Sequence, residues 1–250
     1  MKLGIIGVGH LATSILAGLA RAGWTAGDIC LSPRGHGPEL ALRDGYALAQ
    51  DNADLLQQCE LVLLAVRPAD AAKAVDALPW RKEHVLLSAC AGVSLDAIGA
   101  AAPATVVRIM PITASELGAS PTLVFPRTDA ARPFLDALGS AIELESEDQF
   151  DAATVNAAIY GWAQHLIIAG AEWSVTQGLD PHTARQLAAR TFVAAGRMQA
   201  EQDAPMQDVL ASLCTPGGIT EAGLNHLATH AVKEAWCSAC EVVLGRLRGN

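Results

Sequence analysis

The sequence predicts a chain in two parts, a doubly wound α/β domain over residues 1–146 and an all-helical domain over residues 147–250. Three observations support this division. Short apolar runs alternate with segments of helical spacing in the first part, which is typical of a parallel sheet covered by helices on both faces. A glycine-containing turn follows the first of these runs, where a strand would pass into a helix. From Glu147 onward the strand pattern gives way to long helical segments.

The predicted strands of the first domain are short, and Leu61–Val66 and Val85–Leu87 are continuous apolar runs, as expected of strands buried on both faces. They are Lys2–Ile6, Asp28–Leu31, Leu61–Val66, Val85–Leu87, Thr105–Met110, Thr122–Phe125 and Ala141–Leu144. Helical spacing falls between them, and the first helix ends at a glycine, a common stop signal. These helices are Leu11–Ala22, Ala53–Gln58, Asp70–Leu78 and Asp129–Leu138.

The second domain is predicted to consist of long helices over Phe150–Gln177, His182–Gln202 and Glu221–Leu247. Asp180 and Pro181 form a good cap and first-turn pair for the second of them. The helices are rich in alanine and carry few charges, so we expect a partner subunit to cover them.

The bulk composition excludes several classes of protein. Hydrophobic residues make up 51% of the chain and charged residues 17%, yet no apolar run reaches the roughly 18 residues that a membrane-spanning helix needs. The net charge of −9 argues against a nucleic-acid partner, which favours basic surfaces. The six cysteines are scattered and the N-terminus shows no secretion signal, so we expect a cytoplasmic protein with reduced thiols.

A dinucleotide-binding fingerprint follows the first predicted strand. Gly7 allows a tight turn, Gly9 lets the backbone approach a pyrophosphate, and Ala12 is small enough for the helix to pack on the strand. The phosphates would lie at the positive N-terminus of this helix, beside His10 and Leu11. The alternative is a strand–turn–helix connection that merely requires glycine.

The loop after the second predicted strand favours NADPH over NADH. Proteins that bind NAD usually place a carboxylate there for the ribose 2′-hydroxyl. The loop from Ser32 to His36 contains no carboxylate, and the guanidinium of Arg34 suits a 2′-phosphate, which it can bind through two hydrogen bonds. The alternative is an exposed loop arginine without a ligand.

Three further segments carry a resemblance to a known family. The segment Cys214–Thr220 reads Cys-Thr-Pro-Gly-Gly-Ile-Thr and lies between helical segments. Ala65–Pro68 reads Ala-Val-Arg-Pro, and Ser88–Val93 reads Ser-Ala-Cys-Ala-Gly-Val. In this order after the fingerprint, they resemble the Thr-Pro-Gly-Gly-x-Thr, Ala-Val-Lys-Pro and Ala-Gly-Ile motifs of the pyrroline-5-carboxylate reductase family. The resemblance covers nearly the whole chain.

The resemblance implies an NADPH-dependent reductase of a cyclic imine, which in this family is pyrroline-5-carboxylate and yields proline. It implies a Rossmann-type NADP-binding domain followed by a helical dimerisation and substrate domain, and a homodimer or higher homo-oligomer through the C-terminal helices. The residues that it places at the cofactor, beside those of the fingerprint, are Ser32, Arg34, Ala65, Val66, Arg67, Pro68, Ala91 and Gly92.

The Thr-Pro-Gly-Gly loop is the expected substrate site. The amides of Gly217 and Gly218 can form a nest for a substrate carboxylate. The resemblance implies that the Thr220 hydroxyl hydrogen-bonds the ring nitrogen, and that Thr215 and Ile219 line the same loop. The alternative is that Thr215 and the following proline simply cap the next helix. Both interpretations are compatible, because a capping turn with free amides also binds anions.

The sequence departs from the family pattern in two places near the substrate. The pattern Arg-x-Met-Pro-Asn-x-Pro has become Arg108 to Ala114, with Ile112 in place of the asparagine and Ala114 in place of the second proline, so a polar contact is lost and the loop is less rigid. The family's Ser-Gly-Ser-Gly-Pro segment is replaced by bulkier residues over 157–162. We therefore expect pyrroline-5-carboxylate to be a poor substrate. Tyr160, in this segment, is either a replacement proton donor or a core aromatic residue.

Two other functions are considered. A β-hydroxyacid dehydrogenase shares the architecture but relies on a lysine early in the helical domain, and no lysine lies between Lys82 and Lys233. A catalytically idle NADP-binding dimer, acting as a sensor or scaffold, would explain the altered 157–162 segment. Retention of Thr220 and the double glycine argues against that role.

A metal site is not expected. His226, His230, Cys237 and Cys240 are metal-ligating types, but they fall on one predicted helix. At 1.5 Å per residue that helix would separate the cysteines from the histidines too far for one ion.

Overall fold

The computed structural model describes residues 2–249. The chain forms two compact units, one of residues 1–157 and 244–250 and the other of residues 158–243. The sheet ends before α6, which begins at Glu147, so the predicted boundary at residue 146 lies where strands give way to helices. The compact units divide further along, inside α6.

The first unit is built on an eight-stranded sheet in the order β3-β2-β1-β4-β5-β6-β7-β8. Neighbouring strands are parallel except for the antiparallel pair β6–β7. The strands are β1 (Leu3–Ile6), β2 (Ile29–Leu31), β3 (Ala47–Leu48), β4 (Leu61–Leu64), β5 (Val85–Ser88), β6 (Thr105–Met110), β7 (Ser120–Phe125) and β8 (Gly139–Glu143). The order reverses between β1 and β4, which is where open α/β sheets bind ligands.

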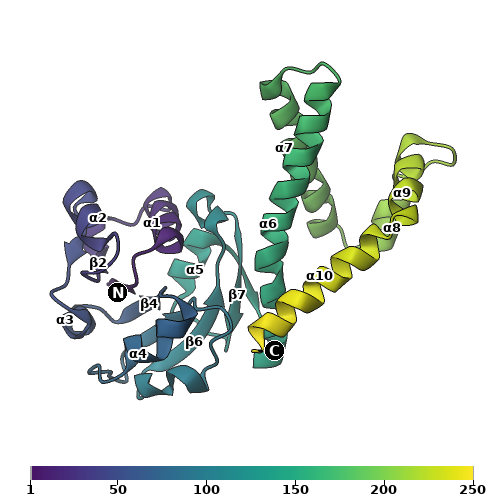
Figure 1. The fold of residues 1–250 in the computed structure, drawn as a ribbon. Coiled ribbons are helices and arrows are strands. Elements are labelled where there is room, and N and C mark those ends of the chain that lie inside the picture. The colour runs from purple at the N-terminus through teal and green to yellow at the C-terminus, as the bar shows by residue number, and fades with distance from the viewer. Residues whose placement is uncertain (1, 250) are drawn as a thin grey trace. The chain divides into compact units, whose positions relative to one another are not determined.

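The helices of the first unit cover both faces of the sheet (Figure 1). They are α1 (His10–Arg21), α2 (Gly37–Asp44), α3 (Asn52–Gln58), α4 (Ala71–Val75) and α5 (Arg132–Leu138). The sequence analysis missed α2 and β3, because α2 buries only one large apolar side chain, Leu40, and β3 has two residues. The segment predicted as one helix from Asp70 to Leu78 is a 3₁₀ turn followed by the short α4.

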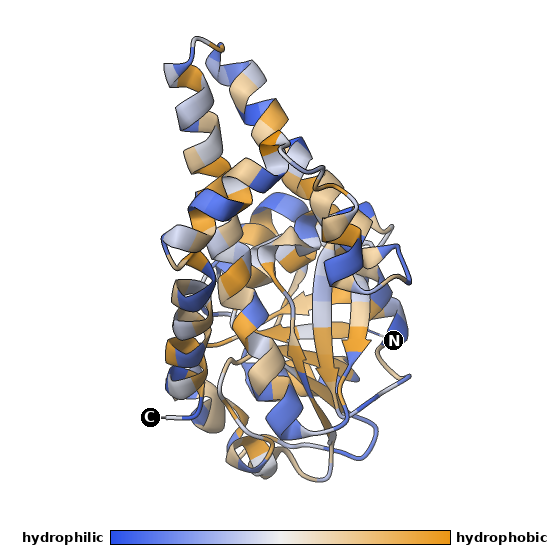
Figure 2. Cartoon of the chain, turned by 90° about the vertical axis from the view of Figure 1, so that its right-hand side faces the viewer, coloured by the Kyte–Doolittle hydropathy of each residue, from blue (hydrophilic) through white to orange (hydrophobic). Residues whose placement is uncertain are grey.

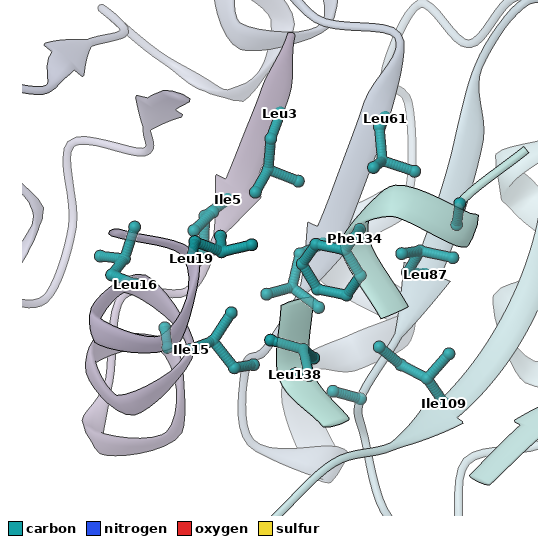
Figure 3. Close-up of a cluster of buried hydrophobic side chains, with 14 of the residues drawn as sticks. Leu3, Ile5, Ile15, Leu16, Leu19, Leu61, Leu87, Ile109, Phe134 and Leu138 are labelled. Carbon is teal, nitrogen blue, oxygen red and sulfur yellow. The ribbon is translucent and has the colours of Figure 1, made fainter. Parts of the chain in front are cut away.

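Two buried apolar clusters flank the sheet. One lies between the strands and helices α1 and α5, and Figure 3 shows its side chains meeting from these elements. The other packs α3 and α4 against the opposite face. Much of the sheet is coloured as hydrophobic in Figure 2, as the apolar runs predict, because β1, β2, β4 and β5 are buried along their whole length. The core therefore holds the carboxyl ends of β1, β2 and β4 at fixed positions.

The remaining helices are α6 (Glu147–Thr176), α7 (Pro181–Ala200), α8 (Met206–Ala211), α9 (Ile219–Thr229) and α10 (Val232–Leu247). Ser146 directly precedes α6, and its Oγ accepts a hydrogen bond from the amide of Gln149 at 3.2 Å. Asp180 caps α7 as predicted, since its Oδ1 accepts from the amides of His182 and Thr183 at 3.1 Å each. Within residues 2–249, no helix is long and apolar enough to cross a membrane.

The predicted single helix from Glu221 to Leu247 is wrong. The chain breaks between α9 and α10 at Ala231, which has a φ of +50° and lies in the left-handed region. Neither glycine nor proline marks this break, and the free-energy cost of the left-handed conformation is modest for alanine. The two histidines lie in and just after α9, and the two cysteines lie on α10, a separate helix.

Candidate functional site

Gly7 brings two predicted cofactor segments together at the carboxyl ends of β1 and β4. Its φ is +93°, and a Cβ atom at this position would lie 2.7 Å from Cγ1 of Val66 and 2.8 Å from the carbonyl carbon of Ala65. Any side chain would therefore collide with the turn after β4. Glycine is required here by both conformation and space, and this contact lies at the point where the strand order reverses.

Gly9 faces open space at the start of α1. It is the N-cap residue, with an extended φ of −106°, and no heavy atom lies within 4 Å of the position that a Cβ would occupy. No side chain caps α1 among the described residues, so no side-chain oxygen takes the first amides of the helix, from His10 and Leu11 onward. Uncapped amides at a helix N-terminus are groups that bind anions. Ala12, one turn into the helix, is fully buried against the sheet.

The loop after β2 is held against the fingerprint turn. The Oγ of Ser32 accepts a hydrogen bond from the amide of Gly7 at 3.2 Å, and Ser32 is only 2% exposed. His36 donates its amide to the carbonyl of Val8 at 2.9 Å. Gly35, at φ +68°, approaches Val8 so closely that a Cβ would lie 2.6 Å from its carbonyl oxygen. The loop is thus rigidly placed, with Ser32 turned inward.

Arg34 is exposed at the tip of this loop, one residue before Gly35. The loop that carries Arg34 is pinned to the fingerprint turn on both sides, by the hydrogen bond between Ser32 and Gly7 and by the bridge between Val8 and Gly35. The sequence analysis did not predict the contact between Gly35 and Val8. The glycine directly after Arg34 was the only local indication in the sequence that the backbone of this loop approaches another segment closely.

The turns after β4 and β5 support each other through Cys90. Its thiol donates to the carbonyls of Val66 at 3.4 Å and Leu64 at 3.7 Å. Burial raises the pKa of Cys90, so this thiol stays protonated and serves as a small packing group. Ala91 is partly buried beyond it, while Arg67 and Pro68 of the other turn are exposed.

Gly92 contacts the end of α10, a relationship that the sequence did not reveal. Its φ is +71°, and a Cβ there would lie 3.0 Å from the carbonyl oxygen of Leu247. The last turn of α10 packs on the small-residue segment Ser88–Val93, and this packing is a further reason why a glycine is needed at position 92.

Arg108 joins the sheet to the first turns of α6. Its Nη1 lies 2.7 Å from Oε1 of Glu147, and its Nη2 lies 2.7 Å from Oδ1 of Asp151. The guanidinium carbon also lies 4.4 Å from the ring centre of Phe150. Glu147 accepts a further bond from the amide of Leu95 at 2.8 Å. The arginine of the Arg-x-Met-Pro motif is therefore an anchor for α6.

The loop that follows Arg108 is held by serines. The Oγ of Ser120 accepts from the amide of Ile112 at 3.0 Å, and the Oγ of Ser115 donates to the carbonyl of Ile112 at 2.6 Å. The loss of a proline at Ala114 was expected to loosen this loop. These side-chain hydrogen bonds fix the backbone on both sides of Ile112 instead.

The Thr-Pro-Gly-Gly loop differs from the predicted anion nest. The amide of Gly217, whose φ is +76°, donates to Oε2 of Glu221 at 2.7 Å. The amide of Gly218 donates to the carbonyl of Thr215 at 2.8 Å. The prediction that both glycine amides are free is therefore wrong, because one is bonded by a side chain and the other closes the turn.

The alternative role of Thr215 as a helix cap is wrong as well. Gly218 is the N-cap of α9, and no side-chain hydrogen bond caps it. Thr220 is the second residue of α9 and is partly buried, whereas Ile219 is 94% exposed. The sequence analysis placed Glu221 at the start of this helix, where acidic residues are common, but did not predict its hydrogen bond with the amide of Gly217.

The bulky segment that replaces Ser-Gly-Ser-Gly-Pro lies on α6. Tyr160 is partly buried there. Trp162 packs edge-to-face against Trp236 of α10, with ring centres 5.3 Å apart, so this tryptophan is a packing residue of the helical unit. The rings of His226 and His230 lie 4.5 Å apart. Across the described part of the chain, no group of three or more metal-ligating side chains is gathered.

Two family models match the chain in the order of its sequence. The model described as "NADP oxidoreductase coenzyme F420-dependent" matches residues 2–92, which contain the fingerprint turn and the turns after β4 and β5. The model described as "Pyrroline-5-carboxylate reductase dimerisation" matches residues 147–249, which begin at Glu147 and include the Thr-Pro-Gly-Gly loop.

Individual proteins match over nearly their whole length. Pyrroline-5-carboxylate reductase 2 of Bacillus subtilis is 27% identical over 249 residues, which cover 94% of this chain and 89% of the relative. The pyrroline-5-carboxylate reductase of Pseudomonas aeruginosa is 27% identical over 237 residues, which cover 89% of this chain and 87% of that protein.

Solved structures share the fold. A pyrroline-5-carboxylate reductase from Streptococcus pyogenes superposes with a TM-score of 0.85 at 25% identity, covering 100% of this chain and 99% of that one. The Plasmodium falciparum protein, solved with NADP bound, gives a TM-score of 0.83 at 22% identity, covering 100% and 97%. Both models and these relatives agree along nearly the whole chain, so they support a member of the pyrroline-5-carboxylate reductase family, and the chain is an NAD(P)-dependent oxidoreductase.

Proposed function

We propose that this protein uses NADPH to reduce the C=N bond of a small cyclic imine to the cyclic amine. The reaction adds a hydride to the imine carbon and a proton to the nitrogen, and leaves NADP⁺. The observation that carries the proposal is the contact of Gly7 with Ala65 and Val66, which places the fingerprint turn at the switch point of the sheet.

The residues of the first unit fit a dinucleotide with a 2′-phosphate. Open space at Gly9 and the uncapped amides from His10 onward suit the pyrophosphate. Arg34 suits the 2′-phosphate, and Ser32 acts by holding its loop on Gly7. The segments Ala65–Pro68 and Ala91–Gly92 would lie along the rest of the cofactor. When bound, NADPH supplies the hydride.

Residues of the second unit would bind and orient the imine. The hydroxyl of Thr220 can hydrogen-bond the ring nitrogen, since a hydroxyl both donates and accepts. The backbone from Thr215 to Ile219 would form the loop around this hydroxyl. Tyr160 is the candidate proton donor, because a phenol is the titratable group of the segment that replaces the family's small residues.

The helical unit supports self-association. Large apolar side chains are exposed along these helices, among them Trp173 at 66% and Val193 at 62%, and hydrophobic residues recur along the helices in Figure 2. Such surfaces are costly in water and are typical of a homodimer interface. The family model matched here is one for dimerisation. We therefore infer a homodimer or higher homo-oligomer through the C-terminal helices.

The cysteines support a reducing compartment such as the cytoplasm. All six are free thiols, and Cys30, Cys59 and Cys90 are buried in the first unit.

The decisive experiment is an assay of NADPH oxidation against a panel of cyclic imines with and without a carboxylate. Turnover of at least one imine, with the corresponding amine as product, is the expected result. NADPH binding without turnover of any imine would contradict the proposal and would favour the catalytically idle NADP-binding dimer.

A further inference from the structure

The two portions of the proposed cofactor lie over different strands of the sheet. The strand order reverses between β1 and β4, and a dinucleotide bound at such a point lies across both halves of the sheet. The loop after β2 carries Arg34, which suits the 2′-phosphate of the adenosine portion. The nicotinamide portion therefore extends the other way, over the turns that follow β4 and β5.

The turn after β5 is a tight four-residue turn from Cys90 to Val93. The carbonyl of Cys90 accepts a hydrogen bond from the amide of Val93 at 3.3 Å, and both residues are buried. Gly92 is the third residue of the turn, with a φ of +71° that glycine adopts without strain. The ends of the turn are thus fixed in the core, while Gly92 is exposed.

The ends of two helices hold this turn. Ala91 packs on a cluster that includes Phe150, from the first turn of α6. The carbonyl oxygen of Leu247, the last residue of α10, lies 3.0 Å from the position that a Cβ of Gly92 would occupy. Residues 244–250 belong to the same compact unit as the turn, so this contact lies within the first unit.

The helix fixes the position of the Leu247 carbonyl. The last four carbonyls of a helix have no amide partner within it, so they face whatever the fold places at the helix end. The amide of Arg248 still donates to the carbonyl of Leu244 at 3.1 Å, and that of Gly249 donates to Arg246 at 3.4 Å. The last turn of α10 is therefore regular up to its contact with Gly92.

We propose that Leu247 is a positioning residue for the nicotinamide portion of the cofactor and that it acts through Gly92. Glycine has the widest backbone freedom of any residue, and the Leu247 carbonyl limits that freedom by filling the space beside it. A turn held in one arrangement binds its ligand without a further ordering cost and keeps the nicotinamide ring in one place. The inference rests on the proposed function, because it requires NADPH to lie over this turn.

The test compares NADPH with adenosine 2′,5′-bisphosphate, which lacks the nicotinamide portion. Calorimetry gives the dissociation constant of each for the full-length protein with Leu247→Pro, Gly92→Ala or both substitutions. Leu247→Pro disrupts the last turn of α10, because proline removes a helical amide and turns the preceding residue away from the helical backbone. Gly92→Ala adds the Cβ atom that would meet the Leu247 carbonyl.

Two further variants are the controls. Gly45→Ala introduces a similar backbone strain, because Gly45 has a φ of +79°, but no atom lies within 4 Å of its Cβ position. Arg248→Ala changes an exposed neighbour of Leu247 and keeps the last turn of the helix. Neither control should change NADPH affinity by more than about twofold.

Leu247→Pro and Gly92→Ala should each weaken NADPH binding by about tenfold, as expected when the competent arrangement of the turn falls to about a tenth of the molecules. Binding of adenosine 2′,5′-bisphosphate should change by less than about twofold. The double variant should bind NADPH no more weakly than Leu247→Pro alone, because the three atoms nearest to the added Cβ all belong to Leu247. For any imine that is reduced, kcat at saturating NADPH should fall by about tenfold to a hundredfold in both single variants.

Unchanged NADPH affinity in either single variant overturns the inference. Equal weakening of the two ligands in Gly92→Ala does so too, because it indicates a general loss of structure. Losses that multiply in the double variant show that the two residues act independently, which also contradicts the inference. Binding of NADPH without turnover of any imine contradicts the proposed function instead, and it leaves the comparison of the two ligands intact.

Discussion

Nη1 of Arg108 lies 2.7 Å from Oε1 of Glu147, and this ion pair connects strand β6 to the first residue of α6. Arg108 is 1% exposed and also pairs with Asp151. A buried guanidinium is tolerated only when its charge is matched. The arginine of a motif that the family resemblance places near the substrate thus has a mechanical role, since it holds α6 where the sheet ends.

Replacing Arg108 with methionine should destabilise the protein by about 3–5 kcal/mol, because it leaves the carboxylates of Glu147 and Asp151 without their partner. The free energy of unfolding in urea measures the effect. Arg132→Met is the control, since Arg132 forms an exposed pair with Asp136 at 2.8 Å and should cost about 0–1 kcal/mol. Equal losses in the two variants would refute the buried anchor.

Substitutions of the two fingerprint glycines should affect different properties, stability for Gly7 and NADPH affinity for Gly9. Gly7→Ala forces a side chain into a left-handed backbone and against Ala65 and Val66, which should cost about 1–3 kcal/mol of stability. Gly9→Ala meets no neighbour and keeps an allowed φ, so the fold should be unaffected while NADPH affinity falls. Thermal unfolding and cofactor titration of both variants check this. Unchanged NADPH affinity in Gly9→Ala would mean that the open space is not the pyrophosphate site.

Arg34 should set the preference for NADPH. Arg34→Ala should reduce the difference in binding free energy between NADPH and NADH by about 1–3 kcal/mol, the scale of a charge-assisted hydrogen bond. Arg21→Ala is the matched control, because Arg21 lies at the opposite end of α1 from the fingerprint turn. Equal affinity of the unsubstituted protein for the two cofactors would rule out this role.

Thr220 should affect the chemical step. Thr220→Ala should lower kcat/KM for every active imine by roughly tenfold to a thousandfold, as expected for one lost transition-state hydrogen bond, without changing NADPH affinity. Thr229→Ala removes a hydroxyl from the last residue of the same helix and should leave kinetics unchanged. If Thr220→Ala retains full turnover, the substrate nitrogen is bound elsewhere.

The helical unit should mediate assembly. Light scattering at micromolar concentration should give at least twice the 26.0 kDa of one chain. Trp173→Glu combined with Val193→Glu should lower that mass, because both place charge on exposed apolar positions of the long helices. Leu42→Glu, on α2 of the first unit, is the control, since Leu42 is also exposed. A monomeric mass for the unsubstituted protein would contradict the proposed dimer.

The sequence was sufficient for features that depend on neighbouring residues along the chain. Continuous apolar runs predicted the buried strands, and β6 begins and ends at the expected residues, Thr105 and Met110. Asp180 and Pro181 predicted the start of α7 because capping is a local interaction. Features with weak local signals were missed, including the two-residue β3 and the break at Ala231, which no glycine or proline marks.

The contacts that define the candidate sites needed the tertiary structure, because they join residues far apart in sequence or depend on side-chain direction. The sequence indicates a glycine at position 7, but only the fold shows that Ala65 and Val66 exclude a side chain there. Likewise, the double glycine predicts an anion-binding loop, whereas the fold shows the carboxylate of Glu221 on the amide of Gly217. A motif can thus be recognised from neighbouring residues in the sequence. Whether its hydrogen-bonding groups are free to bind a ligand depends on which other residues contact them in the folded chain.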